Sequence, residues 1–83
     1  MKKNHVDIKL NSPIEINGVE TKTLRMREPT VGDQLAATEN SLSDGMKEIT
    51  FIANLCEVTP DDIKQLTLKD YGKVQEQFVN FTE

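Results

Sequence analysis

The chain has 83 residues, one cysteine, one histidine and a formal net charge of −4. This length fits one domain with a small core, so a partner or a homo-oligomer has a natural role in covering apolar surface. The composition excludes a disulfide framework and a zinc site built from histidine and cysteine, and no apolar run approaches the roughly 20 residues of a membrane-spanning helix. We therefore expect a small soluble intracellular domain.

The charge is distributed unevenly along the chain. Residues 1–27 carry six basic and three acidic side chains, and residues 28–83 carry four basic and eleven acidic ones, so local charges of +3 and −7 sum to −4. Complementary patches of charge can orient contacts between proteins. A solvated acidic face with no binding role explains the same pattern.

The first third of the chain predicts an antiparallel β-hairpin over about residues 5–27. Apolar and polar residues alternate strictly from Val6 to Leu10, which is typical of a strand with one buried face. Asn17-Gly18 then predicts a two-residue type I′ turn, because both central positions of that turn need a positive φ. Such a turn sets Ile16 opposite Val19.

The pairing of the two strands requires an irregularity before the turn. Uninterrupted pairing would point Leu24 and Met26 away from the core. A slip of one residue corrects this by setting Leu24 opposite Leu10 and Met26 opposite Ile8. We therefore predict a β-bulge near Asn11-Ser12-Pro13, where the proline has no N–H to donate to a ladder.

The first predicted helix follows a junction at Pro29. Thr30 is a typical N-cap, Asp33 lies three residues later, and we expect the helix to reach about Glu39. The apolar residues that share one face of this helix are Val31, Leu35 and Ala36. We interpret Pro29, Thr30 and Asp33 as a structural junction that ends the strand and caps the helix.

Further helices are predicted to fill the chain to about residue 81. The most apolar one runs from about Asp44 to Glu57, and Thr59-Pro60 and Thr67 mark two later helix starts. The final helix carries a stripe formed by Tyr71, Val74, Phe78 and Phe81. The predicted fold class is therefore α+β: residues 1–83 form a single domain, with the hairpin over about 5–27 and three or four short packed α-helices over about 30–81.

The sequence offers no convincing catalytic or metal-binding group. Cys56 lies on the predicted core face, which favours an inert thiol over a nucleophile, and His5 lies near a chain end. Glu57, Asp61 and Asp62 lack the alternating ligands and central glycine of a calcium loop. We therefore expect no enzyme activity, no cofactor and no metal.

Binding of nucleic acid is a weaker hypothesis than binding of protein. Residues 59–81 could form a helix-turn-helix, but their charge is near neutral, and phosphate binding needs clustered cations. Lys9, Arg25 and Arg27 form a small basic strand patch that can equally be a solvent face. A protein-interaction module remains, and we expect its contacts at Arg25, Arg27, Phe78 and Phe81.

A further pattern is carried by the order of residues along the chain, and its most specific piece is residues 27–33, Arg-Glu-Pro-Thr-Val-Gly-Asp. Together with Leu10, Pro13-Ile14, Gly18 and Leu24-Arg25-Met26 before it, this piece resembles one known family, the tail assembly chaperones of Mu-like and P2-like contractile-tailed phages. A late Asp70-Tyr71 and Phe78 match the aromatic-rich end of the family. Most of the chain, roughly residues 6–81, takes part.

The resemblance implies a non-enzymatic role in building the tail of a phage or prophage. Such chaperones are thought to bind the tape measure protein, keep its long helical apolar surface soluble, and help to recruit tail tube subunits. The cytoplasm of the bacterial host is the implied location. A longer frameshifted form exists for many members, and most are absent from the finished particle. A small nucleic-acid-binding regulator and a structural tail component retained in the particle remain as alternatives.

Overall fold

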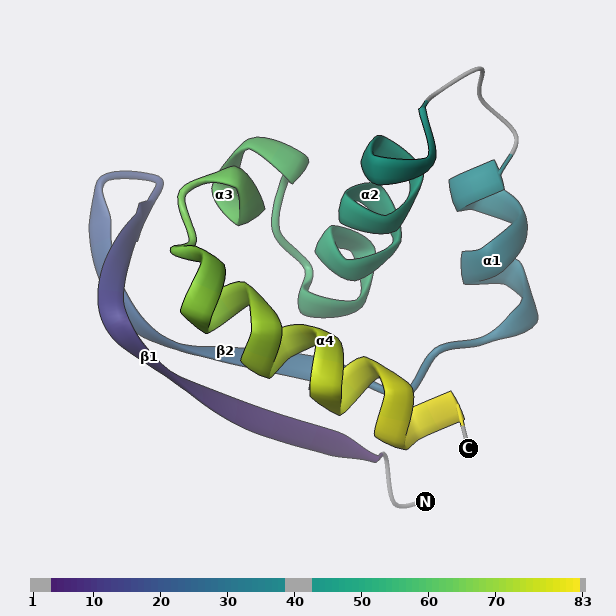
Figure 1. Ribbon diagram of the computed structural model, residues 1–83, viewed down its shortest axis with the longest axis horizontal. Coiled ribbons are helices and arrows are strands. Elements are labelled where there is room, and N and C mark those ends of the chain that lie inside the picture. Colours follow the sequence, from purple (N-terminus) through teal and green to yellow (C-terminus); the bar gives the residue numbers. More distant parts are fainter. Residues whose placement is uncertain (1–3, 39–42, 83) are drawn as a thin grey trace.

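Four helices cover one face of a curved β-hairpin in the computed structural model, which describes residues 4–38 and 43–82 (Figure 1). The elements are β1 (His5–Ile16), β2 (Val19–Arg27), α1 (Val31–Thr38), α2 (Asp44–Cys56), α3 (Pro60–Lys64) and α4 (Leu68–Thr82). Helix α4 packs along β1, α2 packs on β2, and α1 packs against α2. The predicted α+β class, with an antiparallel hairpin followed by short helices, is confirmed.

The hairpin turn forms where the sequence predicts it. Asn17 and Gly18 have φ values of 54° and 78°, which are the positive values that a type I′ turn requires. Ile16 pairs with Val19. The local sequence therefore sets the register next to the turn.

The β-bulge lies in the predicted place but is larger than the predicted slip of one residue. Lys9 pairs with Thr23 and Ile14 pairs with Thr21, so residues 10–13 of β1 oppose Lys22 alone. The predicted pairs Leu10/Leu24 and Ile8/Met26 are wrong, and the observed pairs are Ile8/Leu24 and Val6/Met26.

The size of this bulge has a physical cause outside the hairpin. The backbone N–H groups of Asn11 and Ser12 donate hydrogen bonds to the carboxylate of Asp70 on α4, at 2.9 and 3.0 Å. These two N–H groups bind α4 and therefore do not pair with β2. As a result, β1 contains more residues than β2 between the two paired stretches.

The core joins the concave face of the hairpin to α2, α3 and α4. Its buried residues are Ile8, Ile14, Leu24, Met26, Ile52, Ala53, Leu55, Cys56, Ile63 and Val74. Cys56 is 7% exposed, and burial raises the pKa of its thiol to about 11. This environment disfavours the thiolate that a nucleophile would need.

Helix α1 differs from the sequence prediction in the face that it buries. Val31 and Leu35 are 75% and 58% exposed, Ala36 is also exposed, and Ala37 is buried instead. The bond between Arg27 and Asp33 fixes the rotation of α1, and Ala37 turns inward because it lies one helical turn after Asp33. The predicted end near Glu39 lies outside the described residues.

Helices α2 and α3 begin where the sequence predicts them, and each start has a side-chain cap. Ser43 caps α2, and Thr59 forms a capping box with Asp62 at the start of α3. Helix α2 ends at Cys56, one residue earlier than predicted, because Glu57 adopts a left-handed conformation with φ 58°. Its backbone N–H bonds back to the last turn, as at helix ends that usually carry glycine.

Candidate partner-binding surface

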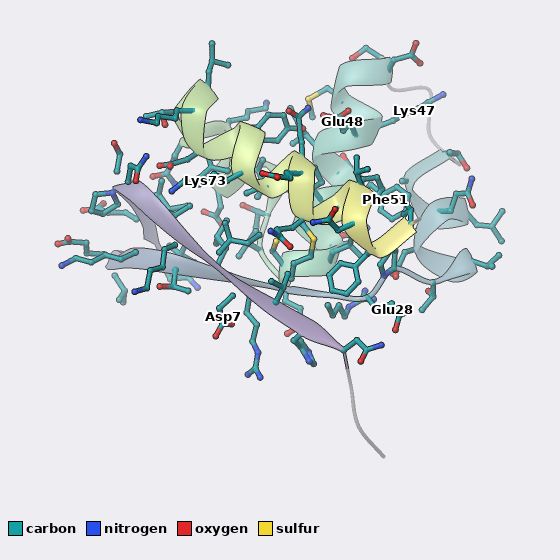
Figure 2. The ribbon with its side chains drawn as sticks, turned by 60° about the horizontal axis from the view of Figure 1, so that its bottom comes forward. Asp7, Glu28, Lys47, Glu48, Phe51 and Lys73 are labelled. Carbon is teal, nitrogen blue, oxygen red and sulfur yellow. The ribbon has the colours of Figure 1, made fainter. Side chains whose placement is uncertain are left out.

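The predicted site residues fall on two different sides of the molecule. Arg25 lies exposed on β2 with its Nε 3.8 Å from Oδ1 of Asp7. Figure 2 shows Asp7 on the side of the hairpin that faces away from the helices, whereas Phe51 lies among the helices. Phe51 contacts Phe78 with ring centroids 5.0 Å apart. The structure therefore does not bring Arg25 together with the aromatic residues of α4.

Arg27 is held within the chain by the junction that follows it. Its two terminal nitrogens donate to the two carboxylate oxygens of Asp33, both at 2.7 Å, which is the strong two-pronged geometry of an arginine–carboxylate pair. This contact raises the pKa of Arg27 and holds the pKa of Asp33 well below its usual range. We call this pair the junction clip. A contact between Arg27 and a partner stays a prediction.

Asp33 also completes the cap of α1. Its Oδ2 accepts hydrogen bonds from the backbone N–H and the hydroxyl of Thr30, at 2.9 and 3.0 Å. In return, the Thr30 hydroxyl accepts from the Asp33 N–H at 3.2 Å. These are the bonds that the structural interpretation of Pro29, Thr30 and Asp33 requires. One carboxylate thus joins the end of β2 to the start of α1.

Asp70 is an organising residue that the sequence analysis noted only as part of the family resemblance. Among the described residues, Asp70 is the charged residue whose side chain is fully buried, with 0% exposure. Its carboxylate accepts hydrogen bonds from the bulge of β1. The N–H groups of Asn11 and Ser12 lower the pKa of Asp70, and Lys73 adds a cation 3.9 Å away. The spacing Thr67–Asp70 signals only a helix start. The acceptor role of Asp70 depends on residues that are far away in the chain.

The outer edge of β1 is covered by other side chains from the same region. The side-chain amide of Gln65 donates to the Glu15 carbonyl at 2.7 Å and accepts from the Glu15 N–H at 3.0 Å. Lys73 donates to the Lys9 carbonyl at 3.0 Å. A strand edge closed in this way is a poor template for adding a partner strand at these positions. The helical side of the molecule, where Leu68 is exposed, is the candidate surface for a partner.

Two largely apolar hollows open on that helical side. The first, which we call the α3 hollow, has a volume of about 270 Å³ and is lined by Ile49, Ile63, Lys64, Leu66, Leu68 and Tyr71. The second, the α1 hollow, has a volume of about 290 Å³ and is lined by Gln34, Ala37, Thr38, Lys47, Glu48, Phe51 and Phe78. Leu68 at the α3 hollow is 90% exposed. Exposed apolar surface of this kind is typical of sites that bind proteins.

A polar bridge between α2 and α4 separates the two hollows. Glu48 accepts hydrogen bonds from the Tyr71 hydroxyl and from Nε2 of Gln75, the latter at 2.8 Å. Burial and the nearby Glu48 carboxylate raise the pKa of Tyr71, so its hydroxyl stays a donor at neutral pH. Figure 2 shows Lys47, Glu48 and Phe51 together on the helical side, beside α4.

Of the predicted aromatic contacts, Phe78 lines the α1 hollow, and Phe81 lines neither of the two hollows described above. Phe78 forms one wall of the α1 hollow, and both phenylalanines are partly buried against the core. Leu68 was not predicted as a contact residue, because hydrophobic periodicity does not identify the first residue of a helix. Its signal in the sequence is a large apolar residue directly after the cap Thr67.

The described surface is apolar at the two hollows and carries a few charged groups around them. Within residues 4–38 and 43–82, no three histidine, cysteine or acidic side chains gather in a way that could hold a metal ion. Over the same ranges, no helix combines the length and the apolar character needed to cross a membrane. Each hollow has largely apolar walls and one lysine in its lining. The Glu48 carboxylate between the hollows already accepts a hydrogen bond from the Tyr71 hydroxyl.

Comparison with known proteins relates nearly the whole chain to a protein family. The model of a protein family described as phage tail assembly chaperone proteins, E, or 41 or 14, matches residues 7–83. A search of curated proteins and a search of solved structures gave no significant match. The matched range contains both strands except for the first residues of β1, all four helices and both hollows.

Proposed function

The chain belongs to the family of phage tail assembly chaperones, and from that premise we propose that it binds the tape measure protein of the same phage or prophage and keeps it soluble during tail assembly. The role is non-enzymatic and is carried out in the cytoplasm of the bacterial host. Recruitment of tail tube subunits to the bound tape measure protein is part of the same proposal.

The observation that carries the proposal is the pair of apolar hollows on the helical side. A tape measure protein is expected to be a long helical rod with apolar seams, and such seams aggregate unless they are covered. Grooves between helices bind amphipathic helices through apolar anchors that recur every three or four residues. Each small chaperone would bind weakly, and several copies along one rod would keep it soluble while remaining displaceable.

The two alternative functions have less support on this surface. A nucleic-acid-binding regulator would need free cations, yet Arg27 is bound to Asp33 and Arg25 lies beside Asp7. A structural tail component would stay in the particle, and a search for the chain in purified particles by mass spectrometry would detect it.

Co-expression with the tape measure protein from the same genome tests the proposal. We expect the tape measure protein to move from the insoluble to the soluble fraction and to copurify with this chain when the chain is tagged near Met1. The tape measure protein expressed alone, and with an unrelated acidic domain of similar size, provides the controls. A tape measure protein that stays insoluble and unbound in the presence of this chain would contradict the proposal.

A further inference from the structure

We infer that one partner helix binds across both hollows at once, placing one apolar side chain in each and a carboxylate beside each of them. This inference rests on the proposed function and adds to it the surface, the spacing and the charge of the partner. The occupant is therefore an amphipathic helix with acidic residues next to two apolar anchors.

The two hollows lie along one stripe of α4. Leu68 and Tyr71 line the α3 hollow and Phe78 lines the α1 hollow, with Gln75 between them. The spacings of three, four and three residues place these side chains on the same helix face. At a rise of about 1.5 Å per residue, Leu68 and Phe78 are about 15 Å apart along the axis. A partner helix spans this distance with anchors ten or eleven residues apart.

The bridge between the hollows restricts the middle of the partner. The Glu48 carboxylate, already bound by Tyr71 and Gln75, leaves a polar ridge where an apolar side chain would bury a charged group. A small or polar residue fits above that ridge. The surface thus selects two separated anchors over one continuous apolar seam.

The lining of each hollow carries one lysine, which favours a partner with a carboxylate at each of these two places. The helical part of the chain is acidic overall, with eleven acidic and four basic residues after residue 27, and its basic residues are Lys47, Lys64, Lys69 and Lys73. One of them lines each hollow: Lys64 the α3 hollow and Lys47 the α1 hollow. The ion pair that Lys64 makes with Asp61 is 3.7 Å long and exposed, so the lysine can exchange it for a partner carboxylate at little cost. Complementary charge of this kind sets the register of a bound helix.

Three acidic substitutions at exposed positions test the inference. Leu68→Glu changes the α3 hollow and Gln34→Glu changes the α1 hollow, each by adding a negative charge. Val31→Glu is the matched control, because Val31 is exposed and lines neither hollow. Glutamate in the first turn of a helix, as at positions 31 and 68, does not oppose folding.

The measurement is the amount of tape measure protein retained per molecule of the tagged full chain, with the urea midpoint of each variant as a check on folding. We expect wild type and Val31→Glu to bind equally and Leu68→Glu and Gln34→Glu each to bind about tenfold less. If wild type binds and either hollow variant binds as well as Val31→Glu, the two-hollow inference is wrong while the proposed function stands. If wild type does not bind, the proposed function fails and the inference fails with it.

Discussion

Replacement of Asp70 by asparagine is expected to lower the urea midpoint of unfolding strongly. The Asp70 carboxylate is fully buried and accepts the N–H groups of Asn11 and Ser12, one on each oxygen. Asparagine keeps one acceptor oxygen and replaces the other with a donor, so one backbone N–H of the bulge faces an NH₂ group. The charge that attracts Lys73 is lost as well. Helix α4 and β1 thereby lose their main polar connection.

Asp61→Asn is the matched control for this substitution. The Asp61 side chain is 91% exposed and pairs loosely with Lys64, so its replacement is expected to leave the midpoint almost unchanged. Urea titrations of the two variants and wild type, followed by circular dichroism, make the comparison. Equal midpoints for Asp70→Asn and wild type would show that α4 is held by apolar packing alone.

The same carboxylate predicts how stability depends on pH. The folded structure lowers the pKa of Asp70 and of Asp33, whereas both groups have the ordinary pKa of about 3.9 in the unfolded chain. Their stabilising contribution is therefore complete above about pH 5 and is lost as the pH falls through the folded pKa values. We expect the urea midpoint of wild type to decrease below about pH 5, and Asp70→Asn to show a smaller decrease. An identical decrease in both proteins would contradict this assignment.

Removal of the junction clip is the second large effect that we expect. Arg27→Ala removes two charge-assisted hydrogen bonds of 2.7 Å to Asp33, which should reduce the free energy of unfolding by about 2 kcal/mol. Arg25→Ala is a matched control on the same strand, because Arg25 and Asp7 are both exposed and 3.8 Å apart. We expect that control to cost less than about 0.5 kcal/mol.

A double-mutant cycle makes the prediction for the clip specific. Urea titrations of Arg27→Ala, Asp33→Ala and the double variant should show a coupling free energy of at least about 1 kcal/mol, whereas distant residues would add independently. Asp33→Ala should also cost the cap of α1, since Asp33 accepts from Thr30. Independent effects of Arg27→Ala and Asp33→Ala would refute the clip.

The junction clip also connects stability to the candidate surface. Helix α1 supplies Gln34, Ala37 and Thr38 to the wall of the α1 hollow. The clip fixes the start and the rotation of α1, so it also fixes the shape of this hollow. Arg27 can therefore influence binding through α1 without touching the partner.

The features that the sequence predicts correctly are those determined by neighbouring residues. Asn17-Gly18 specifies its turn, and Thr30 and Thr59 specify helix starts, because each effect acts within four residues. The predicted class, α+β with an N-terminal hairpin, follows from the same local signals. The family resemblance adds the tail assembly role, which no single residue reveals.

The features that the sequence predicts incorrectly depend on distant contacts. The size of the β1 bulge is set by Asp70, which lies 59 residues after Asn11. The buried face of α1 is set by Arg27 rather than by the apolar residues of the helix itself. The candidate surface shows the same pattern, because Phe78 follows from the periodicity of its helix, whereas the hollow beside Leu68 exists only once α2, α3 and α4 have come together.

Methyl NMR of the chain in complex with the tape measure protein tests the central claim most directly, since it locates the bound surface on the intact chaperone. We predict that the methyl signals of Leu68, Ile63 and Ala37, which line the two hollows, shift on binding. Val19, which is 64% exposed at the tip of the hairpin, should keep its free position and serves as an internal reference. Shifts confined to the hairpin, with Leu68 and Ala37 unchanged, would contradict a chaperone that holds its partner between its helices.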